Sequence, residues 1–499
     1  MKKIIIIFLF ILIQVGYTQS NFTNFVSAVN SASSDTEKTR LVDSFMVHAR
    51  SVGIPYVEET ICNFIYRGAG ANVYLAGDMN GWSASTDKLQ KLSTTNFFYL
   101  TKTYELDARL DYKFIRDGNW ILDPENPKTV SGGFGPNSEL VPKGCPNGRL
   151  CRIPTMPNYV QPLEIKYYSD ISHGTLKDTT FFSLYLGNPR TVRVYLPPNY
   201  STSTDSFPLI LFHDGLEYVS LASAHNVIDY LISRNEIEPV IAVFIPPVNR
   251  TPEYAGSSMG EFTNFIVNEI IPYIDSRYRT KRNSGSRATA GASNGGNISL
   301  WLAYSHPEVF GNVAAHSSNV ITSTSQGFQN SPKLNLKVYL DIGKYDIARL
   351  IPLVRNLKSI LESKSYDLYY REYNEGHSWG FWRAHIDDYL KFFFPKTSTK
   401  VEENKEINSI DGFKLYQNYP NPFNSATRIQ YTVVSSQHVT LKVYDSLGRE
   451  VANLVNEIKE AGVHNSPFSI LNSPLPSGVY YYQLRTNGFV ESKKIVVLK

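Results

Sequence analysis

The sequence contains only three cysteines among its 499 residues, Cys62, Cys145 and Cys151. Three thiols are too few for a disulfide-stapled fold, and none stands with histidines at the spacing of a zinc site. In an oxidising compartment, Cys145 and Cys151 could close the short loop CPNGRLC, although three unpaired thiols are the alternative. We therefore expect the fold to depend on hydrophobic cores, and we expect no metal or other cofactor.

An excess of charge of one sign is also missing. The 49 Lys and Arg residues nearly balance the 45 Asp and Glu residues, which gives a formal net charge of +4. No run of five or more basic residues occurs, so the electrostatic signature of a nucleic-acid-binding protein is absent. We expect no nucleic-acid partner.

Long apolar runs are confined to the N-terminus. Two lysines are followed there by ten apolar residues from Ile4 to Ile13 and then by small and polar residues, which is the pattern of a secretory signal peptide. No later segment reaches about 18 uninterrupted apolar residues, so we expect no stable membrane span.

The length exceeds what one hydrophobic core usually supports, and the residue pattern changes several times along the chain. In the N-terminal helical segment, Leu41, Phe45 and Val47 are expected near one face. The predicted boundaries are 1–19 for the signal peptide, 20–55 for the helical segment, 56–152 for a first β-sandwich, 153–165 for a proline-containing linker, 166–395 for an α/β domain, 396–411 for a polar linker and 412–499 for a second β-sandwich.

The α/β domain alternates apolar strands, such as FPLILFHDG and PVIAVFIPP, with amphipathic helices. Near-continuous apolar strands that alternate with helices are typical of a parallel sheet covered on both faces. The two flanking β regions instead show short alternating strands between Asn, Gly and Asp turns, which predicts antiparallel sheets.

Ser293 lies at the centre of GASNG, between the strand SRATA and the helix NISLWLAYSHP. A G-x-S-x-G turn from strand to helix needs minimal side chains two positions either side of a strained central residue, and Gly291 and Gly295 provide them. The turn also sets the serine at a helix N-terminus, where free N–H groups favour developing negative charge. We interpret Ser293 as a nucleophile; a small-residue turn without chemistry is the alternative.

A serine nucleophile needs a base that a carboxylate orients. His377 lies in a loop between a strand and a helix, and Asp346 lies just past the end of the strand LKVYLDIG. Asp341 is the competing carboxylate, but it lies inside the C-terminal end of that strand, so we favour Asp346. The other candidates for the base within the α/β domain are His306, His316 and His385, of which His306 and His385 are interpreted as ordinary helix residues.

The strand LILFHDG ends at His213, Asp214 and Gly215. A backbone N–H of Gly215 or Leu216 is expected to complete an oxyanion hole beside that of Asn294. A plain turn is the alternative for this loop.

Substrate contacts are predicted for Trp379, His213, Asp214 and Tyr254. In NRTPEYAG, Arg250, Glu253 and Tyr254 are substrate-binding candidates, although a loop-fastening salt bridge is the commoner use of such residues.

Residues from about 165 to 395 resemble the esterase D, enterochelin esterase and feruloyl esterase group of α/β-hydrolases. The resemblance is carried by RVYLPPNY, FHDG, NEIIPYIDSRY, GASNGG, DIGKYD and GHSWGFWR. It implies an α/β-hydrolase fold, a triad of Ser293, Asp346 and His377, and hydrolysis of bulky aromatic or carbohydrate-linked esters.

The first β region is similar to the early-set modules called family 48 carbohydrate-binding modules, through VYLAGDMNGW and YKFIRDGNWILDP. The resemblance implies an immunoglobulin-like sandwich with Trp82 and Trp120 as sugar-stacking candidates; packing in a core or turn is the alternative for both rings.

The last region resembles the sorting domain of type IX secretion, through LYQNYPNPFNSATRIQYTV, VYDSLGREV and PSGVYYYQL. This implies a second sandwich, a type IX secretion partner and export to the cell surface or medium.

We therefore expect a secreted serine carboxylic-ester hydrolase that acts through an acyl-enzyme on feruloyl, acetyl or other bulky esters of polysaccharides. The open alternatives are hydrolysis of siderophore esters or aromatic polyesters, acyl transfer to sugars, and an inactive surface protein that binds carbohydrate.

Overall fold

The computed structural model describes residues 21–140, 159, 162–396 and, with short gaps, 413–497. The predicted signal peptide, the Cys145–Cys151 loop and most of both predicted linkers lie outside the described residues. The chain divides into two compact units, Met1–Thr397 and Ser398–Lys499, which are described separately. None of the described helices is both long enough and apolar enough to cross a membrane.

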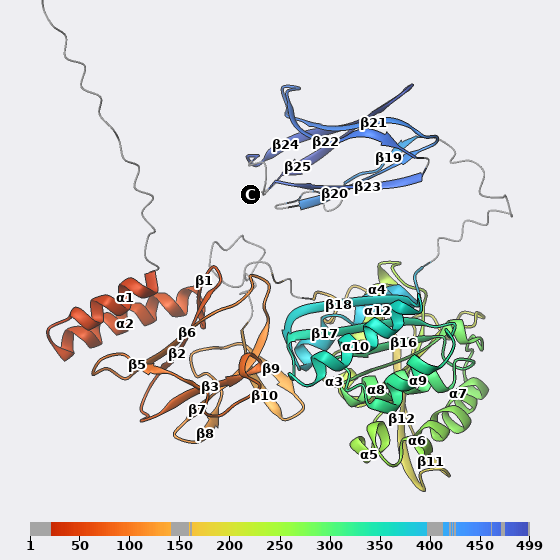
Figure 1. Cartoon of the computed structure of the whole chain (residues 1–499), viewed down its shortest axis with the longest axis horizontal. Helices are drawn as coiled ribbons and strands as arrows, with labels where there is room; N and C mark the ends of the chain where they lie inside the picture. The colour runs from red at the N-terminus through yellow and green to blue at the C-terminus, as the bar shows by residue number, and fades with distance from the viewer. Residues whose placement is uncertain are drawn as a thin grey trace, which may run out of the picture. The chain divides into compact units, whose positions relative to one another are not determined.

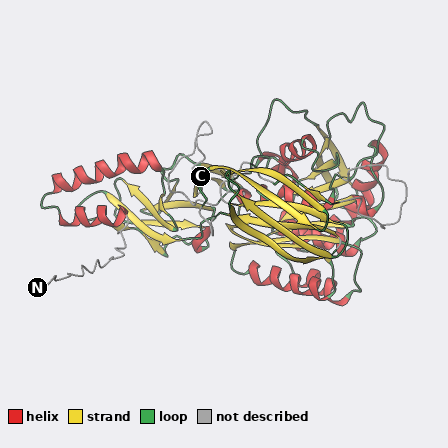
Figure 2. Cartoon of the chain, turned by 90° about the horizontal axis from the view of Figure 1, so that it is seen from above, coloured by secondary structure: helices red, strands yellow, loops and turns green. Residues whose placement is uncertain are grey.

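The first unit begins with two helices, α1 (Asn21–Ser31) and α2 (Asp35–Val52), which lie side by side (Figures 1 and 2). Ser34 caps α2 by accepting a hydrogen bond from the backbone N–H of Glu37 at 3.2 Å. The prediction that Val47 belongs to the apolar face is wrong, because its side chain is 68% exposed. The buried residues follow the i, i+3, i+4, i+7 spacing of one helix face and are Val42, Phe45, Met46 and Ala49.

A module of short strands follows and forms two sheets. The first has the order β1-β2-β6-β5; the second has the order β4-β3-β7-β10-β9, with β8 paired to β7. Every strand pairing in both sheets is antiparallel, as the alternating pattern predicts. The strands are β1 (Tyr56–Glu58), β2 (Ile61–Arg67), β3 (Val73–Gly77), β4 (Asp87–Lys88), β5 (Gln90–Lys91), β6 (Phe97–Thr103), β7 (Leu110–Arg116), β8 (Asn119–Ile121), β9 (Thr129–Gly132) and β10 (Gly135–Leu140).

Strands of both sheets contribute to one apolar core, which includes Phe64, Leu75 and Phe114. We call residues 56–140 the N-terminal β module.

The rest of the first unit is built on an eight-stranded sheet of order β11-β12-β14-β13-β15-β16-β17-β18. The strands from β14 to β18 in this order are parallel, and β11 and β12 are antiparallel additions at one edge. The strands are β11 (Thr175–Ser183), β12 (Asn188–Leu196), β13 (Leu209–His213), β14 (Ile241–Ile245), β15 (Arg287–Ala292), β16 (Asn312–His316), β17 (Lys337–Tyr345) and β18 (Asp367–Gly376).

Helices cover both faces of this sheet, which is why its central strands are buried at every position. Apolar residues of α5 to α10 share one core with alternate strand residues such as Leu209 and Val243. Those of α3, α4, α11 and α12 share a second core with Ile210 and Phe244. The helices are α3 (Gly215–Ser220), α4 (Ala224–Ser233), α5 (Arg250–Ala255), α6 (Met259–Asn264), α7 (Ile271–Arg277), α8 (Asn294–Ser305), α9 (Thr322–Asn330), α10 (Leu350–Ser363), α11 (Trp379–Arg383) and α12 (Ile386–Phe393).

The second unit consists of antiparallel strands in two sheets, of order β19-β20-β23 and β22-β21-β24-β25. Its apolar core includes Ile429, Leu441 and Ile495. The strands are β19 (Lys414–Leu415), β20 (Ala426–Val433), β21 (Gln437–Tyr444), β22 (Glu450–Lys459), β23 (Gly462–Ser469), β24 (Gly478–Thr486) and β25 (Phe489–Val497).

Candidate active site

Ser293 occupies the turn between β15 and α8 in a backbone conformation that non-glycine residues rarely adopt, with φ 57° and ψ −118°. A Cβ on Gly291 would overlap the backbone of Gly295, so the turn closes only with glycine at position 291. The N–H of Ser293 donates to the carbonyl oxygen of His316 at 2.9 Å, which fixes the turn to the end of β16. Surrounding contacts hold this strained turn in place at the carboxyl end of a central strand. The hydroxyl of Ser293 lies at the tip of the turn.

His377 and Asp346 follow two neighbouring parallel strands at the same level, because Tyr345 of β17 pairs with Gly376 of β18. Nδ1 of His377 lies 2.8 Å from Oδ1 of Asp346. A carboxylate only accepts hydrogen bonds, so Nδ1 carries the proton and Nε2 is left with a free lone pair. His377 is partly exposed and the side chain of Asp346 is buried, which leaves the imidazole accessible and its partner fixed.

Asp341, the competing carboxylate, forms its side-chain hydrogen bonds with residues other than His377. Its Oδ2 lies 2.6 Å from Nδ1 of His316 and accepts from the hydroxyl of Tyr339 at 2.9 Å. Both Asp341 and His316 are fully buried. The structure therefore pairs each carboxylate with a different histidine, and of these two histidines it is His377 that lines the cavity described below.

The other two candidate histidines, His306 and His385, also have local partners. His306 directly follows the last residue of α8 and contacts Glu308 at 3.0 Å on the surface. His385 is hydrogen-bonded to Glu375 at 3.0 Å and to Asp388 at 3.3 Å. Burial lowers the pKa of His385, but the hydrogen bonds to Asp388 and Glu375 outweigh it and raise the pKa to about 10. A histidine that stays protonated at neutral pH cannot serve as a general base.

Ser293 and His377 line one cavity of about 670 Å³. Its walls come from two parts of the first unit, the α/β region and the N-terminal β module. The module contributes Trp82, Asp111, Lys113, Trp120, Phe134 and Asn137, together with Gly132 and Gly133. No sequence pattern indicates that the module borders the Ser293 cavity, because neither periodicity nor turn chemistry reports which elements of different domains meet.

Aromatic rings dominate both walls of this cavity. Trp82 and Trp120 stack with their centroids 6.5 Å apart, Trp120 is 48% exposed, and Phe134 is completely exposed. In the α/β region, Trp379 and Trp382 meet edge to face at 5.0 Å, and Trp382 also meets the His377 ring at 5.0 Å. The two tryptophans predicted either to stack on sugar or to pack in a core thus lie in the wall of the Ser293 cavity. Trp379, for which a substrate contact is predicted, also lines this cavity.

Asp214 also lines the cavity, but its carboxylate is occupied by Arg250 through two hydrogen bonds of 2.7 Å. Arg250 donates in addition to the carbonyl oxygen of Ala292 at 3.2 Å, next to Ser293. Glu253 forms a buried bidentate pair with Arg190. The alternative of loop-fastening salt bridges therefore holds for Arg250 and for Glu253.

The predicted substrate contacts of His213 and Tyr254 are wrong, because both side chains are fully buried and neither borders the cavity. Nε2 of His213 lies 3.0 Å from the hydroxyl of Thr289, and the Tyr254 hydroxyl accepts from the N–H of Asp214 at 3.0 Å. Both side chains stabilise the end of β13 and the loop that follows it. The sequence pattern cannot distinguish this packing role from contact with a ligand.

Two helix N-termini face this edge of the sheet. Asn294 is the first residue of α8, where backbone N–H groups have no partner within the helix. Gly215 and Leu216 open α3, and a Cβ on Gly215 would overlap the backbone of β14 at Phe244. The three residues predicted to form the oxyanion hole thus lie at helix starts that follow β15 and β13, adjacent strands in the sheet.

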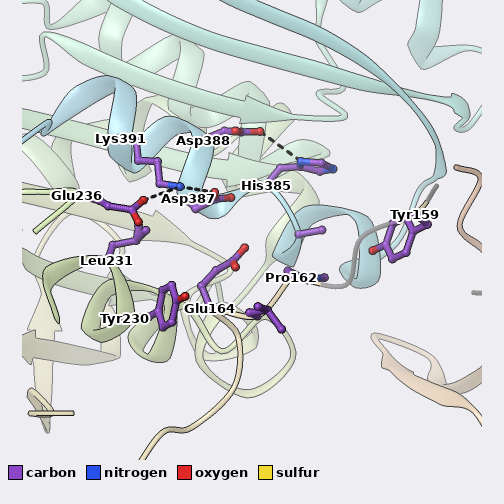
Figure 3. A pocket seen from close by; sticks show the side chains of 12 residues that line it. Tyr159, Pro162, Glu164, Tyr230, Leu231, Glu236, His385, Asp387, Asp388 and Lys391 are labelled. Carbon is purple, nitrogen blue, oxygen red and sulfur yellow. Dashed lines mark hydrogen bonds and ion pairs between the residues drawn. The ribbon is translucent and has the colours of Figure 1, made fainter. Parts of the chain in front are cut away.

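A second cavity of about 330 Å³ is lined mainly by charged side chains and tyrosines (Figure 3). Lys391 lies 2.9 Å from Glu236 and 3.0 Å from Asp387 there, and His385 contacts Asp388. These charges are paired with one another, and no serine or cysteine lines the cavity.

Comparison with known families gives two matches. Residues 183–393 match the family described as putative esterase, and residues 417–498 match the secretion system C-terminal sorting domain. The chain thus carries an esterase family domain and the sorting tail of type IX secretion, as the sequence motifs indicate.

Similar proteins point the same way. An uncharacterized protein of Bacillus subtilis, YjcH, is 29% identical over 234 residues, which cover 44% of this chain and 97% of that protein. An endo-1,4-beta-xylanase/feruloyl esterase of Xylanibacter ruminicola is 30% identical over 159 residues, which cover 29% of this chain but only 22% of that protein. The ferric enterobactin esterase of Salmonella typhimurium superposes with a TM-score of 0.56 at 16% identity, over 67% of this chain and 93% of the other, which shows a shared fold.

Proposed function

We propose that the esterase family domain hydrolyses carboxylic esters through an acyl-enzyme on Ser293, with His377 as general base and Asp346 as its orienting carboxylate. The observation that carries the proposal is the convergence of Ser293 and His377 on one cavity, with Nδ1 of His377 held 2.8 Å from Asp346. The family match of residues 183–393 supports an ester hydrolase.

The proposed reaction uses each group for one task. Nε2 of His377 takes the proton of Ser293 as its hydroxyl oxygen attacks the ester carbonyl, and Asp346 stabilises the imidazolium that forms. The tetrahedral oxyanion receives hydrogen bonds from the N–H of Asn294 and from the start of α3 at Gly215 or Leu216. His377 returns the proton to the departing alcohol. Water, deprotonated by His377, then attacks the acyl-enzyme, and the acid leaves as Ser293 regains its proton.

The test of this proposal is the turnover of p-nitrophenyl butyrate by Ser293→Ala. Loss of a triad member commonly lowers kcat by several orders of magnitude, so we expect a fall of at least about 1000-fold. Ser305→Ala is the matched control, because Ser305 ends α8 and its hydroxyl donates to the carbonyl oxygen of Trp301 one turn earlier in the same helix. Equal turnover by the two variants would refute the proposal.

The aromatic walls support a substrate with an aromatic acyl group. The cavity of about 670 Å³ is lined by Trp82, Trp120 and Phe134 of the module and by Trp379 of the α/β region, and it is far larger than an acetyl group requires. One relative carries the name endo-1,4-beta-xylanase/feruloyl esterase, and the sorting tail fits an exported enzyme that meets polymeric substrates outside the cell. Feruloyl esters of polysaccharides are therefore the proposed substrate class.

Comparison of substrates tests the substrate class. We expect kcat/KM for methyl ferulate to exceed that for methyl butyrate by at least about tenfold, because stacked aromatic contacts contribute about 0.5–1.5 kcal/mol each. An equal or inverse ratio would argue for a short acyl group such as acetyl.

A further inference from the structure

The segment before His377 is joined to the N-terminal β module through the backbone. Arg109 directly precedes β7, and its N–H donates to the carbonyl oxygen of Asn374 at 3.1 Å. Arg109 also forms a parallel bridge with Glu375, and the side-chain amide of Asn374 donates to Asp107 at 2.7 Å. The module therefore pairs with the edge of β18 at residues two and three positions before His377 in the sequence.

The side chain of Arg109 reaches past His377 to the residue that follows it. Its guanidinium is completely buried, and Nη1 donates to Oγ of Ser378 at 2.9 Å. The other nitrogens donate to Glu139 and Asp111 of the module, both at 2.7 Å. Oγ of Ser378 accepts in turn from the N–H of Phe381 at 3.3 Å, which caps α11. One arginine thus holds the chain on both sides of the imidazole.

Two glycines in the motif EGHSWG allow this approach. A Cβ on Gly376 would overlap the carboxylate of Asp78, and a Cβ on Gly380 would overlap the guanidinium of Arg109. Neither glycine has a positive φ, so the backbone conformation does not require glycine at either position. Close packing against the module explains why both positions hold glycine. Asp78 also accepts from the N–H of Asp111 at 2.8 Å and from the indole N–H of Trp82 at 3.1 Å, which links the clamp to the cavity wall.

We propose that Arg109 is a positioning residue for His377, so that the esterase reaches full activity only with the N-terminal β module docked. The proposal rests on the proposed function, in which His377 is the general base. A guanidinium directs several hydrogen bonds in one plane, so a buried arginine fixes the orientation of its partners as well as their distance. A shift of about 1 Å in a catalytic group costs on the order of 100-fold in rate, which makes such a clamp effective.

Arg109→Lys in the full chain is the principal test. Lysine keeps a positive charge between Asp111 and Glu139, but its single nitrogen cannot occupy the three positions from which Nε, Nη1 and Nη2 of Arg109 donate to Glu139, Ser378 and Asp111. Arg287→Lys is the matched control, because Arg287 is also buried and paired with Asp275, but at the opposite end of β15 from Ser293. With p-nitrophenyl butyrate we expect kcat of Arg109→Lys to fall about 10- to 100-fold, KM to change less than about threefold, and the melting temperature to match the control within a few degrees.

Ser378→Ala provides a second, independent variant, since it leaves Arg109 between its two carboxylates. We expect a lower kcat here also, and we expect the double variant to be no worse than Arg109→Lys alone, because both changes break the same hydrogen bond. A kcat of Arg109→Lys within twofold of that of Arg287→Lys, or losses that simply multiply in the double variant, would overturn the positioning role.

The two proposals fail in different ways. A wild-type chain whose turnover does not depend on Ser293 would refute the ester hydrolase mechanism itself. A wild-type chain with turnover that depends on Ser293, combined with an unimpaired Arg109→Lys variant, would refute only the positioning role.

Discussion

Asp346 and His377 lie 31 positions apart in the sequence, yet Oδ1 of one is 2.8 Å from Nδ1 of the other. The parallel pairing of β17 with β18 brings them together, because each follows the last residue of its strand. The contact between Asp346 and His377 is therefore a consequence of sheet register. It orients the imidazole before substrate binds.

Asp346→Asn tests this relationship. An amide can donate to Nδ1 and so stabilise the tautomer with its proton on Nε2, which cannot act as a base. We expect kcat for p-nitrophenyl butyrate to fall by about 10⁴, with the melting temperature almost unchanged. A loss of less than tenfold would show that Asp346 does not orient the base.

Asp341→Ala should have the opposite profile. Asp341 is buried and accepts hydrogen bonds from His316 and Tyr339, which would be left without an acceptor. We expect the free energy of unfolding, measured in urea, to fall by at least about 2 kcal/mol, while the folded fraction keeps its turnover within about tenfold. A stable but inactive Asp341→Ala variant would instead make Asp341 the catalytic carboxylate.

Trp120→Ala addresses the aromatic wall. Loss of one exposed ring from the Trp82 stack should raise KM for methyl ferulate about tenfold and leave KM for methyl butyrate within about twofold, because only the aromatic acyl group contacts the ring. Tyr185→Ala is the control, since Tyr185 is an exposed aromatic residue that does not line the cavity. An equal effect of Trp120→Ala on both substrates would exclude aromatic recognition by this wall.

The raised pKa of His385 predicts that the stability of the folded state depends on pH. The hydrogen bonds to Asp388 and Glu375 overcome the effect of burial and raise its pKa to about 10, whereas an unfolded histidine titrates near 6.5. The folded state therefore holds one more proton between about pH 6.5 and 10, and the stability from this group is complete below that window and is lost as pH rises through it.

The measurement is urea unfolding of wild type and His385→Gln at pH 6.5, 8 and 9.5. The difference in unfolding free energy between the two should shrink with rising pH by up to about 1.4 kcal/mol per pH unit. Parallel stability curves would show that His385 does not gain a proton on folding.

The sequence predicted those parts of the molecule that depend on local pattern. Strand and helix periodicity indicated the parallel sheet, and the glycines around Ser293 indicated the strained turn that the structure contains. The choice of Asp346 over Asp341 followed from its place beyond a strand end, and the structure pairs it with His377.

Features that depend on contacts between distant segments could not be predicted. Trp82 and Trp120 suggested a sugar platform, but only the packing of the N-terminal β module shows that they border the Ser293 cavity. His213 and Tyr254 lie next to site residues in the sequence and yet point into buried surroundings. The Arg109 clamp joins residues that are 269 positions apart, so no local pattern could reveal it.

The most direct test of the central claim is mass spectrometry of the chain after reaction with a small fluorophosphonate, with His377→Ala treated in parallel. We predict one adduct, on the peptide that contains Ser293, and a labelling rate at least about 100-fold lower in His377→Ala. Labelling of a different serine, or equal labelling rates in both proteins, would contradict it.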